Sequence, residues 1–147
     1  MDVLTPCVGR DDTLERLSRL VEANRWVTLT GAPGCGKTLV ARHLAASRAG
    51  TRTVWVSASR HPNTDALVTA CLDALGADLA PGESAGLALK RALDEQPLLL
   101  VLDGVDRIDG LGALLDTLVD DAGGLQVLCP ATTDQGSPNE TVSRMPP

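Results

Sequence analysis

The hydrophobic and polar positions of this chain follow two different periodicities. In residues 11–23, apolar side chains at positions 14, 17, 20 and 21 fall on one face of a helix. Residues 98–102 are instead an unbroken apolar run, which is typical of a strand covered on both faces, as in a parallel sheet. Strands and helices alternate along the chain. This order predicts an α/β fold, a three-layer sandwich around a parallel sheet.

Glycine and proline residues mark most of the boundaries between these elements. Pro97 ends one predicted helix, whereas Gly76 and the Gly123-Gly124 pair end two others. The predicted helices span residues 11–23, 39–46, 63–75 (with Asn63 or Thr64 as the first residue), 83–95 and 108–121. The predicted strands span residues 26–30, 52–57, 98–103, 125–129 and 140–145, and residues 130–139 are predicted to form a polar loop.

The composition adds an aliphatic core and an acidic surface. Of the 147 residues, 44% are hydrophobic, but the aromatic ones are only Trp26 and Trp55. The formal net charge of −6 and the lack of aromatic stacking platforms argue against direct binding of nucleic acid. No signal peptide and no membrane-spanning apolar run is visible, so we expect a cytoplasmic protein without membrane contact. The cysteines are widely spaced and are expected to be free thiols.

Residues 31–38 match the phosphate-binding P-loop pattern G-x-x-x-x-G-K-[ST], between a predicted strand and a predicted helix. Glycines let the loop curl until its N–H groups approach phosphate oxygens, and the helix that follows directs its positive end to the same place. Lys37 adds a positive charge near the β- and γ-phosphates, and the Thr38 hydroxyl is placed to bind Mg²⁺. The predicted nucleotide-binding residues of the loop are Gly31, Ala32, Pro33, Gly34, Cys35, Gly36, Lys37 and Thr38.

Asp103 completes the site that the P-loop begins. It ends the apolar strand at the carboxyl edge of the sheet, where ligands of such sheets bind, in the position of a Walker B aspartate that holds Mg²⁺. Thr38 and Asp103 are therefore the predicted metal ligands.

Many P-loop ATPases place a glutamate directly after this aspartate, but here Gly104 follows. Asp106 is the nearest candidate catalytic residue for orienting the attacking water, so we expect at most a slow ATPase.

Three further stretches carry a resemblance to a known family. Together with the P-loop, residues 7–12 (with Val8-Gly9-Arg10), residues 97–106 and residues 143–147 resemble the nucleotide-binding domain of STAND-class signalling ATPases. The closest similarity is to bacterial AfsR- and LuxR-type transcriptional regulators, related to the NB-ARC domain, while AAA-type ATPases of the Orc/Cdc6 group carry a similar Val-Gly-Arg motif. The resemblance implies ATP or ADP with Mg²⁺ as cofactors, and it implies that Val8 and Arg10 contact the adenosine.

The chain departs from this family in two places. Relatives carry a Thr-Ser-Arg or Thr-Thr-Arg segment after the fourth strand, whose arginine reads the phosphates, but Thr132 and Thr133 are here followed by Asp134. Relatives also continue past the closing stretch into a helical lid and further domains. We therefore expect a single P-loop domain over residues 1–147, which is either a domain cut from a longer chain or a small protein that keeps only the nucleotide core. A protein partner and missing C-terminal domains are the candidate partners. The domain comprises an N-terminal segment and helix (1–24) and a core (25–147).

For a P-loop NTPase of this kind we expect a parallel five-stranded sheet. The expected strand order is 140–145, 26–30, 125–129, 98–103 and 52–57. The leading hypothesis for function is an adenine-nucleotide-binding switch. A small P-loop kinase is a second hypothesis, with Arg60, Arg91 and Arg107 available to cover the phosphates. A degenerate interaction module that no longer binds nucleotide is a third.

Overall fold

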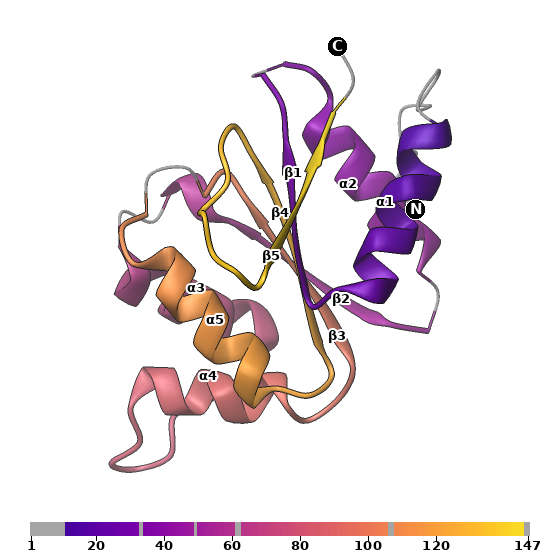
Figure 1. Ribbon diagram of the computed structural model, residues 1–147. Helices are drawn as coiled ribbons and strands as arrows, with labels where there is room; N and C mark the ends of the chain where they lie inside the picture. The colour runs from indigo at the N-terminus through magenta and orange to yellow at the C-terminus, as the bar shows by residue number, and fades with distance from the viewer. Residues whose placement is uncertain (1–10, 33, 49, 61–62, 106–107, 146–147) are drawn as a thin grey trace.

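A computed structural model of the protein describes residues 11–32, 34–48, 50–60, 63–105 and 108–145. A five-stranded sheet runs through the centre of the molecule in the order β2-β3-β4-β1-β5, and neighbouring strands pair in parallel (Figure 1). The strands are β1 (Trp26–Thr30), β2 (Arg52–Ser57), β3 (Leu98–Asp103), β4 (Leu125–Ala131) and β5 (Glu140–Arg144). The helices are α1 (Asp11–Ala23), α2 (Lys37–Ser47), α3 (Thr64–Leu75), α4 (Ala85–Leu93) and α5 (Leu111–Asp121), and the short 3-10 helix η1 (Ala58–Arg60) follows β2. The strand order is the expected one.

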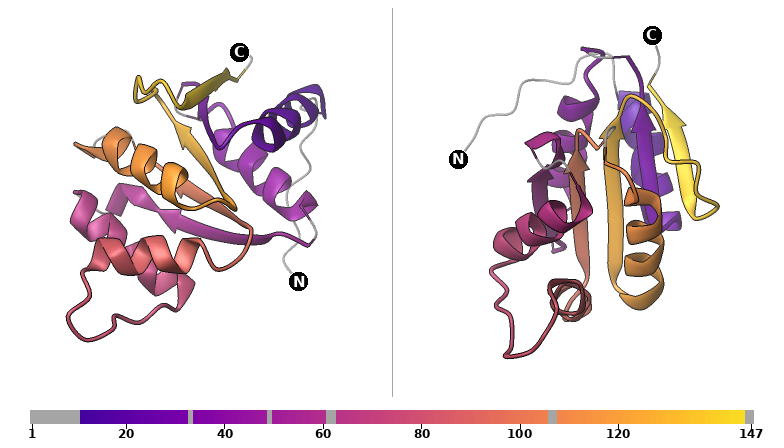
Figure 2. Two further views of the ribbon diagram at one scale, coloured as in Figure 1. Left: turned by 60° about the horizontal axis from the view of Figure 1, so that its bottom comes forward. Right: turned by 90° about the vertical axis from the view of Figure 1, so that its left-hand side faces the viewer.

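Helices cover both faces of the sheet. Helices α1 and α2 lie on one face, and α3, α4 and α5 lie on the other (Figures 1 and 2). Strand β3 shows why an unbroken apolar run is needed in the middle layer. Leu98, Leu100 and Leu102 pack with the three-helix side, whereas Leu99 and Val101 pack with α1 and α2. The expected three-layer sandwich is therefore confirmed.

Local capping explains where two helices begin later than predicted. Helix α4 begins at Ala85 rather than at residue 83, because the Ser84 hydroxyl accepts the Leu87 N–H at 3.2 Å and caps the helix. Helix α5 begins at Leu111 rather than at residue 108, because Gly110 before it adopts a left-handed conformation with φ of 80°.

Strand β4 is longer than predicted and runs through Pro130. The Pro130 carbonyl accepts the Gly104 N–H at 3.3 Å, so the polar groups of this residue face the β3 side. The β3–β4 pairing has by then ended at Val101 and Leu128, whereas pairing with β1 continues to Ala131. A missing N–H on the β3 side leaves the β1–β4 pairing intact, which is why a proline is tolerated in this central strand.

The loop between β4 and β5 is tied down by two carboxylates. Glu140, at the start of β5, accepts the backbone N–H groups of Gln135 and Gly136, each at 2.9 Å, and the hydroxyl of Thr28 on β1. Asp116 of α5 accepts a second pair of side-chain donors from the same loop. The predicted loop is thus attached to β5 through Gln135 and Gly136 and to α5 through Ser137 and Asn139.

Two expectations from composition can be compared with the structure. No helix in the described part of the chain is long and apolar enough to cross a membrane. Cys35, Cys71 and Cys129 form no disulfide among the described residues, and Cys7 lies outside them. Burial raises the pKa of Cys71 to about 12 and raises the pKa of Cys129 as well, so both remain neutral thiols near pH 7.

Candidate nucleotide-binding site

The P-loop leaves the carboxyl end of β1 and turns directly into α2. Gly34 and Gly36 both have positive φ, 82° and 94°, a conformation that strains residues with a side chain. The Gly36 carbonyl accepts the Val40 N–H at 3.0 Å, so α2 begins at Lys37, two residues earlier than predicted. The first N–H groups of α2 are thereby left at the loop, where anions bind.

Gly31 is required by close packing rather than by its backbone conformation. A Cβ on this residue would lie 2.6 Å from the Sγ of Cys35 and 3.1 Å from the Cβ of Met145. The Met145 N–H also donates to the Thr30 carbonyl at 2.7 Å. The end of the β5 segment therefore closes against the start of the P-loop, and any side chain at position 31 would push the two apart.

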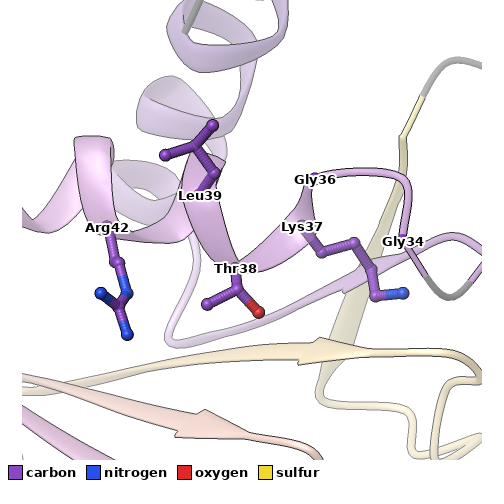
Figure 3. A pocket seen from close by; sticks show the side chains of 6 residues that line it. All are labelled: Gly34, Gly36, Lys37, Thr38, Leu39 and Arg42. Atoms are coloured by element: carbon purple, nitrogen blue, oxygen red, sulfur yellow. The ribbon is translucent and has the colours of Figure 1, made fainter. Parts of the chain in front are cut away.

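The Lys37 side chain folds back over its own loop. Its Nζ donates to the carbonyl oxygens of Gly31, at 2.6 Å, and Ala32, at 3.1 Å. Figure 3 shows the side chain running beneath the loop toward Gly34. Both partners are neutral, and no carboxylate of the described residues forms an ion pair with the ammonium group. A phosphate oxygen can replace these carbonyls and gain a charge-assisted hydrogen bond.

Thr38 and Asp103 meet although they are 65 residues apart in the sequence. The Thr38 hydroxyl donates to the Asp103 carboxylate, with Oγ1 at 3.2 Å from Oδ2 and 3.4 Å from Oδ1. Hydroxyl and carboxylate oxygens are ligands that Mg²⁺ accepts, so this donor set fits the predicted cation. Within the described ranges no cluster of three or more His, Cys, Asp or Glu residues could hold a metal. A magnesium ion here would therefore take its other ligands from phosphates and water.

The position after Asp103 strongly favours glycine. Gly104 has a φ of 80°, and a Cβ on it would lie 2.9 Å from the Cβ of Ser59 in η1. The glutamate that activates water in many P-loop ATPases does not fit here unless η1 moves and the backbone is strained. Asp106, the predicted catalytic residue, lies outside the described residues.

Replacing Gly104 with alanine is expected to destabilise the protein by about 1–3 kcal/mol, because the new Cβ is both strained and crowded. Gly82→Ala is the matched control, since Gly82 also has a positive φ, 78°, but nothing lies within 4 Å of its added Cβ. The free energy of unfolding in urea should fall further for Gly104→Ala than for Gly82→Ala. Equal losses of unfolding free energy would mean that η1 can shift at little cost, and that packing against Ser59 does not require glycine at position 104.

A pocket of about 430 Å³ opens beside the P-loop (Figure 3). The sequence did not single out two of its residues, Leu39 and Arg42. The sequence spacing could have indicated Arg42. It follows Thr38 by four positions, so the two residues lie on the same face of α2. The pocket is lined by Gly34, Gly36, Lys37, Thr38, Leu39 and Arg42.

Other residues of the loop line a separate pocket of about 390 Å³. Gly31 and Ala32 face it from the start of the P-loop, Thr132 and Thr133 from the end of β4, and Arg144 from β5. The two threonines stand where the resemblance places a phosphate-sensing segment. They therefore lie across from the beginning of the P-loop, although the segment carries no arginine.

The structure brings most of the predicted site to one edge of the sheet. Four of the predicted site residues, Val8, Arg10, Pro33 and Asp106, lie outside the described residues. The others gather at the carboxyl ends of β1 and β3 and at the start of α2: Gly31, Ala32, Gly34, Cys35, Gly36, Lys37, Thr38 and Asp103.

A parallel sheet in this order, with a P-loop after β1 and an aspartate at the end of β3, defines a P-loop NTPase fold. Residues 18–132 match the AAA domain family, and the chain belongs to it. The fold is shared with Cdc6p from Pyrobaculum aerophilum, with a TM-score of 0.75 and 19% identity over 96% of this chain and 47% of that chain. The ORC2 protein of Aeropyrum pernix, in its ADPNP-ADP complexes, has a TM-score of 0.66 and 20% identity over 89% of this chain and 43% of that chain.

A more distant structural neighbour is a STAND protein with a tetratricopeptide repeat sensor from Pyrococcus horikoshii. Its TM-score is 0.52 at 16% identity, over 94% of this chain and 22% of that chain. An uncharacterized protein of Mycobacterium tuberculosis is 33% identical over 148 residues, and the chain spans 38% of that curated relative's length. These findings show a P-loop ATPase domain of the AAA type. The closer similarity to AfsR- and LuxR-type regulators stays a prediction.

Proposed function

We propose that this domain binds ATP and ADP with Mg²⁺ and acts as a regulatory switch, with slow hydrolysis or none. The observation that carries the proposal is the contact between the Thr38 hydroxyl and the Asp103 carboxylate, 3.2 Å apart, beside the Lys37 pocket. The phosphates beside Lys37 and the cation beside Thr38 and Asp103 would thus be bound next to each other. The ADPNP and ADP bound by the A. pernix ORC2 protein support an adenine nucleotide as the ligand.

The phosphates would be held by groups that the fold already directs at the pocket. The N–H groups of the loop and of the first turn of α2 would donate to phosphate oxygens, and Lys37 would exchange the carbonyls of Gly31 and Ala32 for them. Thr38 and Asp103 would hold Mg²⁺, which neutralises phosphate charge when bound.

The residues near Asp103 support slow ATP hydrolysis, because two groups that usually promote it are replaced. The glutamate position is taken by Gly104, which is packed against Ser59. The segment after β4 offers the neutral hydroxyls of Thr132 and Thr133 where an arginine would stabilise transferred charge. A site that binds nucleotide tightly but hydrolyses it slowly suits a switch whose state is set by the nucleotide it holds.

A signalling role is supported by the sequence resemblance to STAND-class regulators. In longer relatives, sequence beyond the AAA domain would supply the signal or read the nucleotide state, either in the same chain or as a protein partner. The kinase hypothesis is less well supported, because its candidate Arg91 is paired with Glu83 at 2.8 Å and lines a different pocket.

Calorimetric titration of the purified chain with ADP and with ATP, each with Mg²⁺, tests this proposal. We expect binding of both nucleotides at about micromolar concentration, and phosphate release well below ~1 s⁻¹, the low end for ordinary enzymes. No binding at millimolar nucleotide would favour the degenerate interaction module. Phosphoryl transfer to a small acceptor would favour the kinase.

A further inference from the structure

Arg42 lies on the wall of the P-loop pocket, one helical turn beyond Thr38. One pocket is lined by Gly34 at the loop and by Arg42 on α2. Figure 3 shows the side chains of Thr38 and Arg42 leaving the same side of α2. Side chains on a helix lean toward its N-terminus, so the reach of an arginine at this position is directed back along α2 toward Thr38.

In the part of the chain that the structure describes, the Arg42 guanidinium packs on an aromatic ring and forms no ion pair with an acid. Its Cζ lies 5.5 Å from the centre of the Trp55 ring on β2. The chain has 19 acidic and 13 basic side chains, yet none of the ion pairs among the described residues involves Arg42. A full positive charge therefore lies beside the P-loop pocket, and no carboxylate of the described residues forms an ion pair with it.

The contact with Trp55 can be exchanged for a stronger one. Trp55 is half-buried against the cluster formed by α1 and α2, so its ring is fixed and serves as a resting place for the guanidinium. A cation–π contact at a partly exposed ring is weaker than the bidentate, charge-assisted pair that arginine forms with phosphate. An additional phosphate within reach should therefore draw Arg42 off the ring.

We propose that Arg42 is a specificity-determining residue that moves from Trp55 to the terminal phosphate of a bound triphosphate, so that the site distinguishes ATP from ADP. The loop N–H groups serve phosphates that both nucleotides possess, and Lys37 reaches the β-phosphate of either one as well as the γ-phosphate of ATP. Arg42 is the second cation that lines this pocket, and a third phosphate would add negative charge within its reach. This inference rests on the proposed nucleotide binding.

The test compares ATP and ADP affinities, each with Mg²⁺, in the intact chain and in Arg42→Ala. We expect Arg42→Ala to weaken ATP binding roughly tenfold, the loss of one charge-assisted contact, while ADP affinity changes by less than about twofold. Arg42→Lys, which keeps the charge but not the bidentate geometry, should recover part of the ATP affinity. Arg19→Ala removes an exposed arginine paired with Glu15 on α1 and should change neither affinity.

Trp55 provides a second readout of the same movement. The only other tryptophan, Trp26, is fully buried, so a change in emission reports on Trp55. ATP should change the fluorescence of the intact chain and ADP should not, and the response to ATP should vanish in both Arg42→Ala and Trp55→Phe. A purely structural role for Arg42 would not produce this difference between nucleotides.

The outcomes separate this inference from the proposed function. If the intact chain binds neither nucleotide, both are overturned. If it binds both nucleotides and Arg42→Ala leaves the ratio of their affinities unchanged, the role of Arg42 is overturned and the nucleotide site stands. Should Arg42→Ala lower the melting temperature sharply, Arg42→Gln keeps the aliphatic stem and gives the same comparison in a folded protein.

Discussion

Lys37→Ala is expected to abolish the binding of adenine nucleotides. The Lys37 ammonium makes two hydrogen bonds to neutral carbonyls, at 2.6 and 3.1 Å, and would replace them with contacts to phosphate. Charge-assisted hydrogen bonds contribute about 1.5–3 kcal/mol each, so two of them correspond to a loss of at least ~100-fold. Calorimetric titration with ADP and ATP should show no binding in the variant at concentrations that saturate the intact chain.

The chain offers a matched control for this variant. Lys90 is its only other lysine, and its Nζ pairs with Asp121 at 3.0 Å between α4 and α5. Lys90→Ala removes the same charge away from the P-loop and should leave nucleotide affinity unchanged. If Lys37→Ala bound nucleotide as well as Lys90→Ala does, the pocket beside the P-loop would not be the phosphate site.

Asp103→Asn is expected to remove the dependence of ATP binding on Mg²⁺. The amide has nearly the same shape and can still accept the Thr38 hydroxyl, but it lacks the charge that a hard divalent cation prefers. ATP affinity measured with Mg²⁺ should fall at least ~10-fold, the scale of one lost charged contact. Affinity measured in excess chelator should stay the same or rise, because a carboxylate near the phosphates has been neutralised.

Thr38 variants complete this test of the metal site. Thr38→Ser keeps the hydroxyl and should keep the Mg²⁺ dependence, whereas Thr38→Val should lose it. The losses in Thr38→Val and Asp103→Asn should not add in the double variant, since both remove ligands of one ion. Additive losses would mean that the two residues act separately and that the contact between them does not mark a cation site.

Strong local signals in the sequence account for most of the predicted elements. The glycines of the P-loop, the helix stop at Gly76 and the apolar run of β3 each have one favoured local structure. For the same reason the phosphate loop and the candidate metal ligands could be named from the sequence. The errors lie at boundaries, as at Ser84 and Gly110, where capping and not periodicity decides the first residue of a helix.

Sequence by itself therefore determined the class of fold, the P-loop and the identity of Asp103 as its acidic partner. Only the tertiary structure decided that Thr38 and Asp103 touch, that Gly104 is locked against Ser59, and that Arg42 rests on Trp55. Each of these contacts joins residues from different elements of the fold. Their distances depend on strand order and on how a helix sits over the sheet, which no local periodicity encodes.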